Sequence, residues 1–165
     1  MKRRQFNGLL ICAAGAVAAP RVAAVGPGAV APRFVLPTGD GSTIDLDSLR
    51  DRFVYVDFWA SWCAPCRLSF PWMNRMAERW PSLAVVAINV DKRREDAERF
   101  LRNTPARFPV AFDPDGRTPA LYAVSTMPSA YLLAPGSRVQ WIHRGFRERD
   151  IPLLEAALQQ ALEMR

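Results

Sequence analysis

Runs of apolar residues alternate along the chain with stretches in which apolar residues recur at every third or fourth position. The runs are typical of buried strands, and the periodic stretches are typical of helices with one buried face. The predicted strands are residues 53–58, 83–90 and 110–112, and the predicted helices are residues 63–80, 95–103 and 118–123. Strands that alternate with helices predict a parallel-centred sheet covered on both faces.

Two hairpins and a last helix enclose this alternating region. Residues 31–36 and 43–46 flank a stretch of turn residues, and residues 129–134 and 139–143 flank a Pro-Gly turn, so each pair predicts antiparallel strands. Asp150 is a preferred N-cap residue and precedes a helix with one apolar face. The expected fold class is α/β, with a mixed sheet flanked by helices. A chain of 165 residues, half of them apolar, suits one globular domain.

The first 24 residues have the pattern of a signal peptide. Basic residues at positions 2–4 precede a weakly apolar run at about residues 8–19, and small residues follow it. This run is shorter than the roughly 20 residues that cross a bilayer, and Arg21 limits its extension. Arg3 and Arg4 also fit a twin-arginine motif, so both export routes stay open. We expect a periplasmic protein with one domain at residues 25–165.

Most of the net positive charge of the chain lies in this N-terminal segment. Four of the 22 basic residues and none of the 16 acidic residues fall within residues 1–24, so the rest carries a net charge of only +2. The basic residues at 92–94 are followed at once by Glu95 and Asp96, as at a solvated helix start. This balance argues against a nucleic-acid partner.

Cys63 and Cys66 are the only cysteines of residues 25–165, and they stand between a predicted strand and a predicted helix. At a helix N-terminus the free N–H groups and the helix dipole favour a thiolate, so Cys63 is expected to have a lowered pKa. Cys66 lies one turn further on, within reach of a disulfide. The pattern predicts a reversible dithiol, in which Cys63 exchanges with a substrate disulfide and Cys66 resolves the mixed disulfide.

A zinc site and a purely structural bridge are the other roles open to such a pair. Zinc needs four ligands, and beyond the two cysteines this part of the chain has only His143 as a histidine or cysteine ligand. A bridge over so short a loop removes little entropy from the unfolded chain. We therefore expect no metal and no cofactor.

Residues 56–66, with their Trp-Cys-x-Pro-Cys core, and the pair Met127-Pro128 resemble thioredoxin. The N-terminal hairpin, an additional helix and strand between about residues 91 and 114, and the segment 143–146 resemble the exported TlpA/ResA/DsbE (CcmG) branch of that family. The resemblance implies a thioredoxin-like fold with a central α–β insertion and the activity of a thiol–disulfide oxidoreductase.

The resemblance also assigns site residues by position. Pro128 matches the cis-proline that faces the dithiol, and with Met127 and Trp62 it would bind the client peptide. Asp57 matches a buried acid beneath the dithiol, whose raised pKa would let it exchange a proton with Cys66. A trans-proline at the start of a strand, and an aspartate that bonds locally or faces solvent, are the structural alternatives.

One position departs from the branch. Its members often carry a glutamate three residues after the second cysteine, where this chain has Ser69. We therefore expect proton exchange to depend on Asp57, as in thioredoxin. Membership of the branch is for the same reason a weaker guide to the substrate. His143 is the only histidine, and we expect a structural or surface role for it.

The predicted function is reduction of client disulfides in the cell envelope by the Cys63/Cys66 pair. The resemblance implies client proteins with cysteine pairs, such as apocytochrome c or copper-site proteins, and a membrane thiol carrier as electron donor. We expect a monomer. Two alternatives are a copper chaperone and a peroxiredoxin. A copper chaperone would have three residues between its cysteines and a histidine that reaches them. A peroxiredoxin would have a Pro-x-x-x-Thr/Ser-x-x-Cys motif, which residues 59–62 do not supply.

Overall fold

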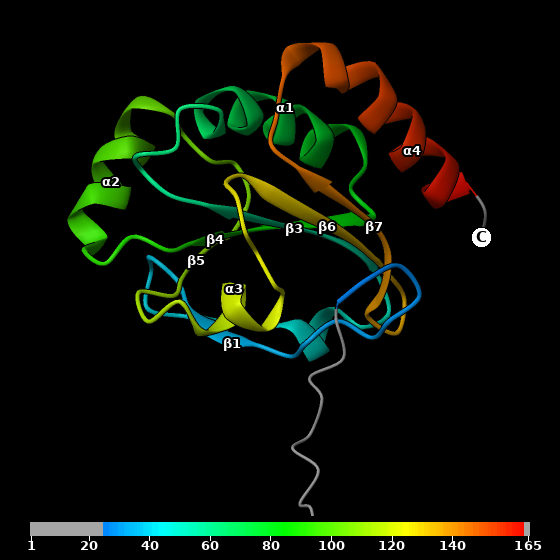
Figure 1. Ribbon diagram of the computed structural model, residues 1–165, viewed down its shortest axis with the longest axis horizontal. Helices are drawn as coiled ribbons and strands as arrows, with labels where there is room; N and C mark the ends of the chain where they lie inside the picture. Colours follow the sequence, from blue (N-terminus) through cyan, green and yellow to red (C-terminus); the bar gives the residue numbers. More distant parts are fainter. Residues whose placement is uncertain (1–24, 164–165) are drawn as a thin grey trace, which may run out of the picture.

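A computed structural model describes residues 25–163 of the chain. The predicted signal peptide at residues 1–24 lies outside the described residues. The centre of the fold is a five-stranded mixed sheet in the order β5-β4-β3-β6-β7 (Figure 1). Its strands are β3 (Phe53–Trp59), β4 (Leu83–Asn89), β5 (Val110–Phe112), β6 (Ser129–Ala134) and β7 (Arg138–Arg144).

The central strand β3 joins the parallel and the antiparallel halves of the sheet. It runs parallel to β4, with Asp57 beside Ala87, and antiparallel to β6, with Asp57 beside Ala130. Every residue of β3 and β4 is buried, which explains why both segments are apolar nearly throughout. The predicted mixed sheet with a closing antiparallel hairpin is confirmed.

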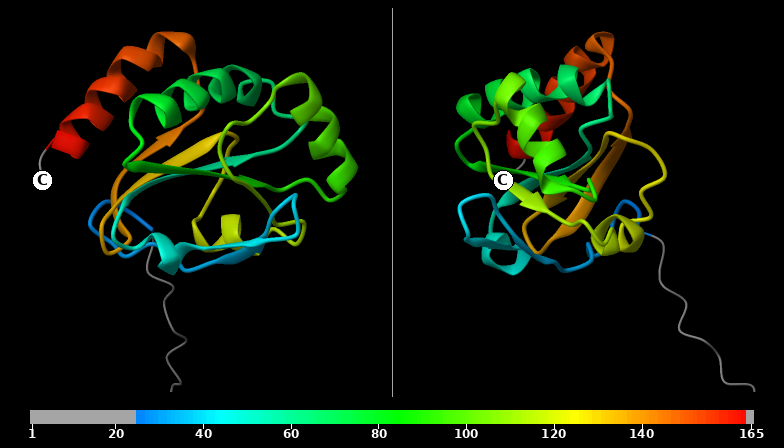
Figure 2. Two further views of the ribbon diagram at one scale, coloured as in Figure 1. Left: turned by 180° about the vertical axis from the view of Figure 1, so that it is seen from behind. Right: turned by 90° about the vertical axis from the view of Figure 1, so that its left-hand side faces the viewer.

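Helices and loops cover both faces of the sheet. One group of helices packs on one face, and the other face is covered by a short helix, the N-terminal hairpin and a 3₁₀ turn (Figures 1 and 2). The first group is α1 (Cys66–Arg79), α2 (Arg94–Asn103) and α4 (Ile151–Glu163). The second group is α3 (Arg117–Leu121), β1 (Val35–Pro37), β2 (Thr43–Asp45) and η1 (Leu46–Leu49), while a second 3₁₀ turn, η2 (Glu148–Asp150), leads into α4.

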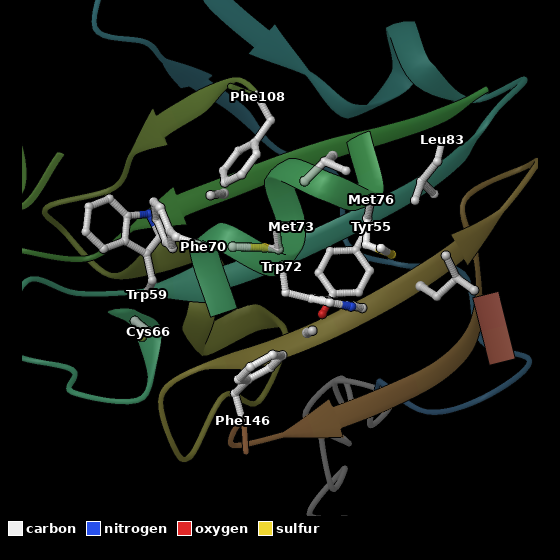
Figure 3. Packing of buried hydrophobic residues seen from close by; sticks show 14 of the residues in the cluster. Tyr55, Trp59, Cys66, Phe70, Trp72, Met73, Met76, Leu83, Phe108 and Phe146 are labelled. Carbon is white, nitrogen blue, oxygen red and sulfur yellow. The ribbon is translucent and has the colours of Figure 1, made fainter. Parts of the chain in front are cut away.

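Aromatic side chains fix α1 against the end of β3. The ring of Phe70 on α1 lies 4.8 Å from that of Trp59 and 5.4 Å from that of Phe108, centroid to centroid (Figure 3). It also lies 5.1 Å from the ring of Phe100. Phe70 and Trp59 are fully buried. Each such pair adds about 0.5–1.5 kcal/mol beyond its buried area. The packing therefore sets where the first turn of α1 lies relative to the carboxyl end of β3.

The helix boundaries differ from the sequence prediction most at α1 and α3. The helix predicted from Cys63 begins at Cys66, because the residues before it form a turn in which the Cys63 nitrogen donates to the Ala60 carbonyl, 3.1 Å away. The helix predicted over residues 118–123 spans 117–121, and Ala123, with a φ of 53°, cannot continue it. Within residues 25–163, none of the helices is both long and apolar enough to span a bilayer.

Candidate active site

A disulfide joins Cys63 and Cys66 in the turn between β3 and α1. The two sulfurs are 2.02 Å apart and the two Cα atoms 5.4 Å apart. Both residues are buried, with exposed fractions of 3% for Cys63 and 0% for Cys66. Cys63 lies in the turn, and Cys66 is the first residue of α1. The structure thus shows the oxidised form of the predicted redox pair.

The start of α1 presents a donor to the sulfur of Cys63. The backbone nitrogen of Cys66 lies 3.2 Å from Cys63 Sγ. The first turn of the helix contains Arg67 and no acidic residue. Positive charge and the helix dipole both favour a thiolate at this end of the helix. In the reduced protein the arrangement is therefore suited to hold Cys63 as the reactive thiolate.

Asp57 is buried in the middle of β3, on the face that α1 covers. Residues 55, 57 and 59 share one face of the strand, and both Tyr55 and Trp59 contact aromatic rings of α1 on that face. Asp57 is 1% exposed, and its Oδ2 has no hydrogen-bond partner within residues 25–163. Burial raises its pKa well above the ordinary value of 3.8, as the sequence predicted. Burial therefore disfavours the charged carboxylate at this position.

A surface depression of about 400 Å³ adjoins the turn that carries the disulfide. It is lined by Trp62, which is 70% exposed, and by residues 124–127. The Met127–Pro128 peptide bond is cis, in agreement with the resemblance to thioredoxin. Trp62, Met127 and Pro128 were named from the sequence, whereas Val124, Ser125 and Thr126 were not, because no motif marks them.

Ser69 and His143 make contacts that the sequence did not predict. Ser69 is buried, and its hydroxyl donates to the Cys66 carbonyl at 3.1 Å, so this position braces α1 and supplies no acid. His143 Nε2 lies 3.7 Å from Asp150 Oδ2. Burial lowers the pKa of His143, and the charge of Asp150 partly offsets this shift. Across residues 25–163, no cluster of three or more His, Cys, Asp or Glu side chains is arranged to bind a metal ion.

Comparisons with known proteins agree with this site. The family model described as the AhpC/TSA family matches residues 27–142. The chain belongs to this family. It is 34% identical over 149 residues to the thiol-disulfide oxidoreductase ResA of Bacillus subtilis strain 168, over 84% of this chain and 83% of that protein.

Solved structures agree with the assignment. A crystal structure described as thiol:disulfide interchange protein DsbE from Chlorobium tepidum has 45% sequence identity and a TM-score of 0.81, and the match covers 84% of this chain and 99% of that one. The exposed lipoprotein thioredoxin of Streptococcus pneumoniae has 25% identity and a TM-score of 0.67, over 78% and 99% of the two chains. Within the family, the chain is thus of the TlpA/ResA/DsbE type, and it is a thiol–disulfide oxidoreductase.

Proposed function

We propose that this oxidoreductase works as a reductant of client proteins in the bacterial cell envelope, through the Cys63/Cys66 dithiol. The observation that carries the proposal is the disulfide at the start of α1, beside the exposed Trp62. Pro65 lies between the two cysteines, as in thioredoxin, and this favours a pair that reduces its clients. The signal-peptide pattern of residues 1–24 supports export.

The reaction transfers two electrons from the dithiol to the client. The Cys63 thiolate attacks one sulfur of the client disulfide, forms a mixed disulfide and displaces the other client sulfur as a thiolate, which takes up a proton. Cys66, once deprotonated, attacks Cys63 Sγ. This step forms the Cys63–Cys66 disulfide and releases the second client thiolate, so the client is reduced and the protein is oxidised.

Asp57 is the proposed proton acceptor for Cys66. A thiol at a fully buried position resists ionisation, and Cys66 is 0% exposed in the oxidised protein. Asp57 lies on the sheet face covered by α1 and is also buried, with a raised pKa. An acid with a pKa shifted toward neutrality transfers protons efficiently in either direction at the pH of the compartment. Asp57 would accept the Cys66 proton during resolution and return it to solvent later.

Trp62, Met127 and Pro128 are the proposed surface for the client. Trp62 places a large apolar ring in solvent directly before Cys63, and aromatic residues are frequent anchors in protein interfaces. The depression lined by Trp62 and residues 124–127 can receive a side chain that neighbours the client cysteine. The backbone next to Pro128 would pair with an extended client segment.

The partners follow from the resemblance. In an oxidising compartment the dithiol must be reduced again after each turnover, and a membrane thiol carrier would supply the two electrons. Client proteins with cysteine pairs, among them apocytochrome c or proteins that assemble copper sites, would receive them.

The deciding experiment equilibrates the protein with glutathione and measures the reduction potential of the Cys63–Cys66 pair. A value well below about −200 mV supports a reductant, whereas a value near about −120 mV would indicate an oxidant and contradict the proposal. Capture of cell-envelope proteins as mixed disulfides on the Cys66→Ser variant then identifies the clients.

A further inference from the structure

The turn that carries Cys63 is tied to the segment after β4 by one buried carboxylate. Asp91 Oδ2 accepts a hydrogen bond from the Ser61 backbone nitrogen at 2.8 Å, and Asp91 Oδ1 accepts one from the Ser61 hydroxyl at 3.0 Å. The side-chain amide of Asn89 donates to Asp91 Oδ2 at 2.8 Å, and the Asp91 nitrogen donates to Asn89 Oδ1 at 3.0 Å. Residues 30 positions apart in the chain are thereby joined.

Two members of this network, Asn89 and Asp91, lie in the interior of the protein, and Ser61 is partly buried. Asn89 is 1% exposed and Asp91 is 7% exposed. A buried polar network whose members are all bonded restricts its surroundings to one arrangement, and loss of a partner leaves a buried donor unsatisfied. If the carboxylate were removed, the partly buried Ser61 N–H would lose its acceptor.

The restraint reaches Cys63 through the backbone. Ser61 precedes Cys63 by two residues, and the Cys63 nitrogen donates to the carbonyl of Ala60 at 3.1 Å. The carbonyl of Trp59 accepts from the Val90 nitrogen at 3.0 Å, which ties the end of β3 to the same segment after β4. Residues 59, 60 and 61 therefore all form hydrogen bonds just before Cys63. Asp91 is the side chain that accepts those from Ser61.

We propose that Asp91, held in place by Asn89, is a positioning residue for the turn at residues 60–65, here called the redox turn. It fixes this turn through Ser61 and keeps the Cys63 sulfur at the start of α1. The inference rests on the proposed function, because it concerns the thiol that attacks the client. Asp91 contacts neither sulfur in the bonds described and acts through Ser61. Its contribution is to keep Cys63 near the Cys66 nitrogen when the disulfide opens and no longer holds the two residues together.

Two substitutions separate the contacts of Asp91 from its charge. In Asp91→Asn, the side-chain oxygen can accept from Ser61 N–H and Asn89, and the new amide can donate to the Ser61 hydroxyl. All three side-chain contacts can thus persist without the charge. Asp91→Ala also removes the charge but removes the three contacts as well, so a difference between these two neutral variants reports the contacts alone.

Asp113 provides a matched control for loss of stability. It is also buried, at 4% exposure, and follows β5 as Asp91 follows β4. Its carboxylate accepts from the backbone nitrogens of Gly116, Arg117 and Thr118, at 3.1, 3.3 and 2.6 Å. These donors belong to the start of α3 and not to the redox turn. Asp113→Ala therefore removes a comparable set of bonds from a different loop.

The experiment measures two properties of the full-length reduced proteins, at a temperature where circular dichroism shows each variant to be folded. One is the rate of insulin disulfide reduction, and the other is the pKa of Cys63 from the pH dependence of its alkylation. We expect Asp91→Asn to stay within about twofold of the unmodified protein, and Asp91→Ala to reduce insulin about tenfold more slowly. The pKa of Cys63 should be higher in Asp91→Ala than in Asp91→Asn, and unchanged in Asp113→Ala.

Equal rates and equal Cys63 pKa values in the two Asp91 variants would overturn the inference, whether both match the unmodified protein or both are impaired. If Asp91→Ala does not fold, Asn89→Ala replaces it, since it removes the amide that holds Asp91. We then expect a rate about threefold lower, and an unchanged rate would overturn the inference. An unmodified protein that fails to reduce insulin would contradict the proposed function instead, while the Cys63 pKa comparison would still test the inference.

Discussion

The backbone nitrogen of Cys66 lies 3.2 Å from the sulfur of Cys63, so the first peptide group of α1 contacts one of the two sulfurs directly. The contact gives the two cysteines different environments although both are buried. Cys63 lies before the helix, where negative charge is stabilised, whereas Cys66 is the first residue of the helix and is fully buried. This asymmetry underlies the different roles expected of the two thiols.

Cys63→Ser should abolish disulfide reduction, because it removes the attacking sulfur. Cys66→Ser should retain the first attack and accumulate mixed disulfides with clients, since no second thiol resolves them. Non-reducing gel electrophoresis of each variant after incubation with an oxidised peptide distinguishes the two outcomes. Adducts on Cys63→Ser but not on Cys66→Ser would reverse the assignment.

The buried Asp57 should make the protein less stable as the pH rises. Its folded-state pKa is raised, so above the ordinary pKa of 3.8 the unfolded chain loses this proton first, and unfolding becomes easier with increasing pH. The slope from this one group approaches about 1.4 kcal/mol per pH unit between the unfolded and folded pKa values. Asp57→Asn should remove that slope and be the more stable protein near neutral pH, as measured by urea unfolding at several pH values. Parallel pH profiles for the two proteins would contradict the raised pKa.

The same substitution should slow the resolving step. Without the carboxyl group, Cys66 loses its proposed proton acceptor, and general-base assistance commonly contributes about 10²–10⁴-fold. The decay of a preformed mixed disulfide on Cys63, followed from pH 6 to 9, is the appropriate measurement. A decay rate with the same pH dependence in Asp57→Asn would remove Asp57 from the mechanism.

Trp62→Ala should weaken client binding without destabilising the fold. An exposed aromatic anchor of an interface contributes about 1–2 kcal/mol or more, which corresponds to a KM about five- to thirtyfold higher. Leu153 on α4 is the matched control, because it is 71% exposed against 70% for Trp62 and lies far along the chain from the redox turn. Leu153→Ala should leave both KM and the melting temperature nearly unchanged. Equal KM values in the two variants would argue against a client surface at Trp62.

Phe70→Ala should cost about 3–5 kcal/mol of unfolding free energy, because Phe70 is completely buried and contacts three aromatic rings. Phe70→Leu keeps most of the apolar volume and should cost less. Chemical denaturation of both variants in the oxidised form provides the comparison. A loss below about 1 kcal/mol in Phe70→Ala would show that the aromatic cluster does not determine the position of α1.

Local patterns in the sequence were sufficient for the order of helices and strands and for the redox pair. Strands β3 and β4 were recognised because a strand buried on both faces must be apolar at nearly every position. Cys63 and Cys66 were recognised because their spacing and their place before a helix are local properties. The burial and raised pKa of Asp57 also followed from its place inside an apolar strand.

Only the tertiary structure showed which distant residues contact the turn that carries the disulfide. Nothing near Asp91 in the sequence indicates Ser61 as its partner, and the contact exists because β3 and β4 are parallel neighbours whose carboxyl ends meet at one edge of the sheet. The depression beside Trp62 likewise depends on how residues 124–127 pass that edge. The sequence by itself determined the elements and the reactive sulfurs, since these depend on residues close together in the chain. Packing decided the surroundings of the sulfurs, because those contacts join segments that only the folded sheet brings together.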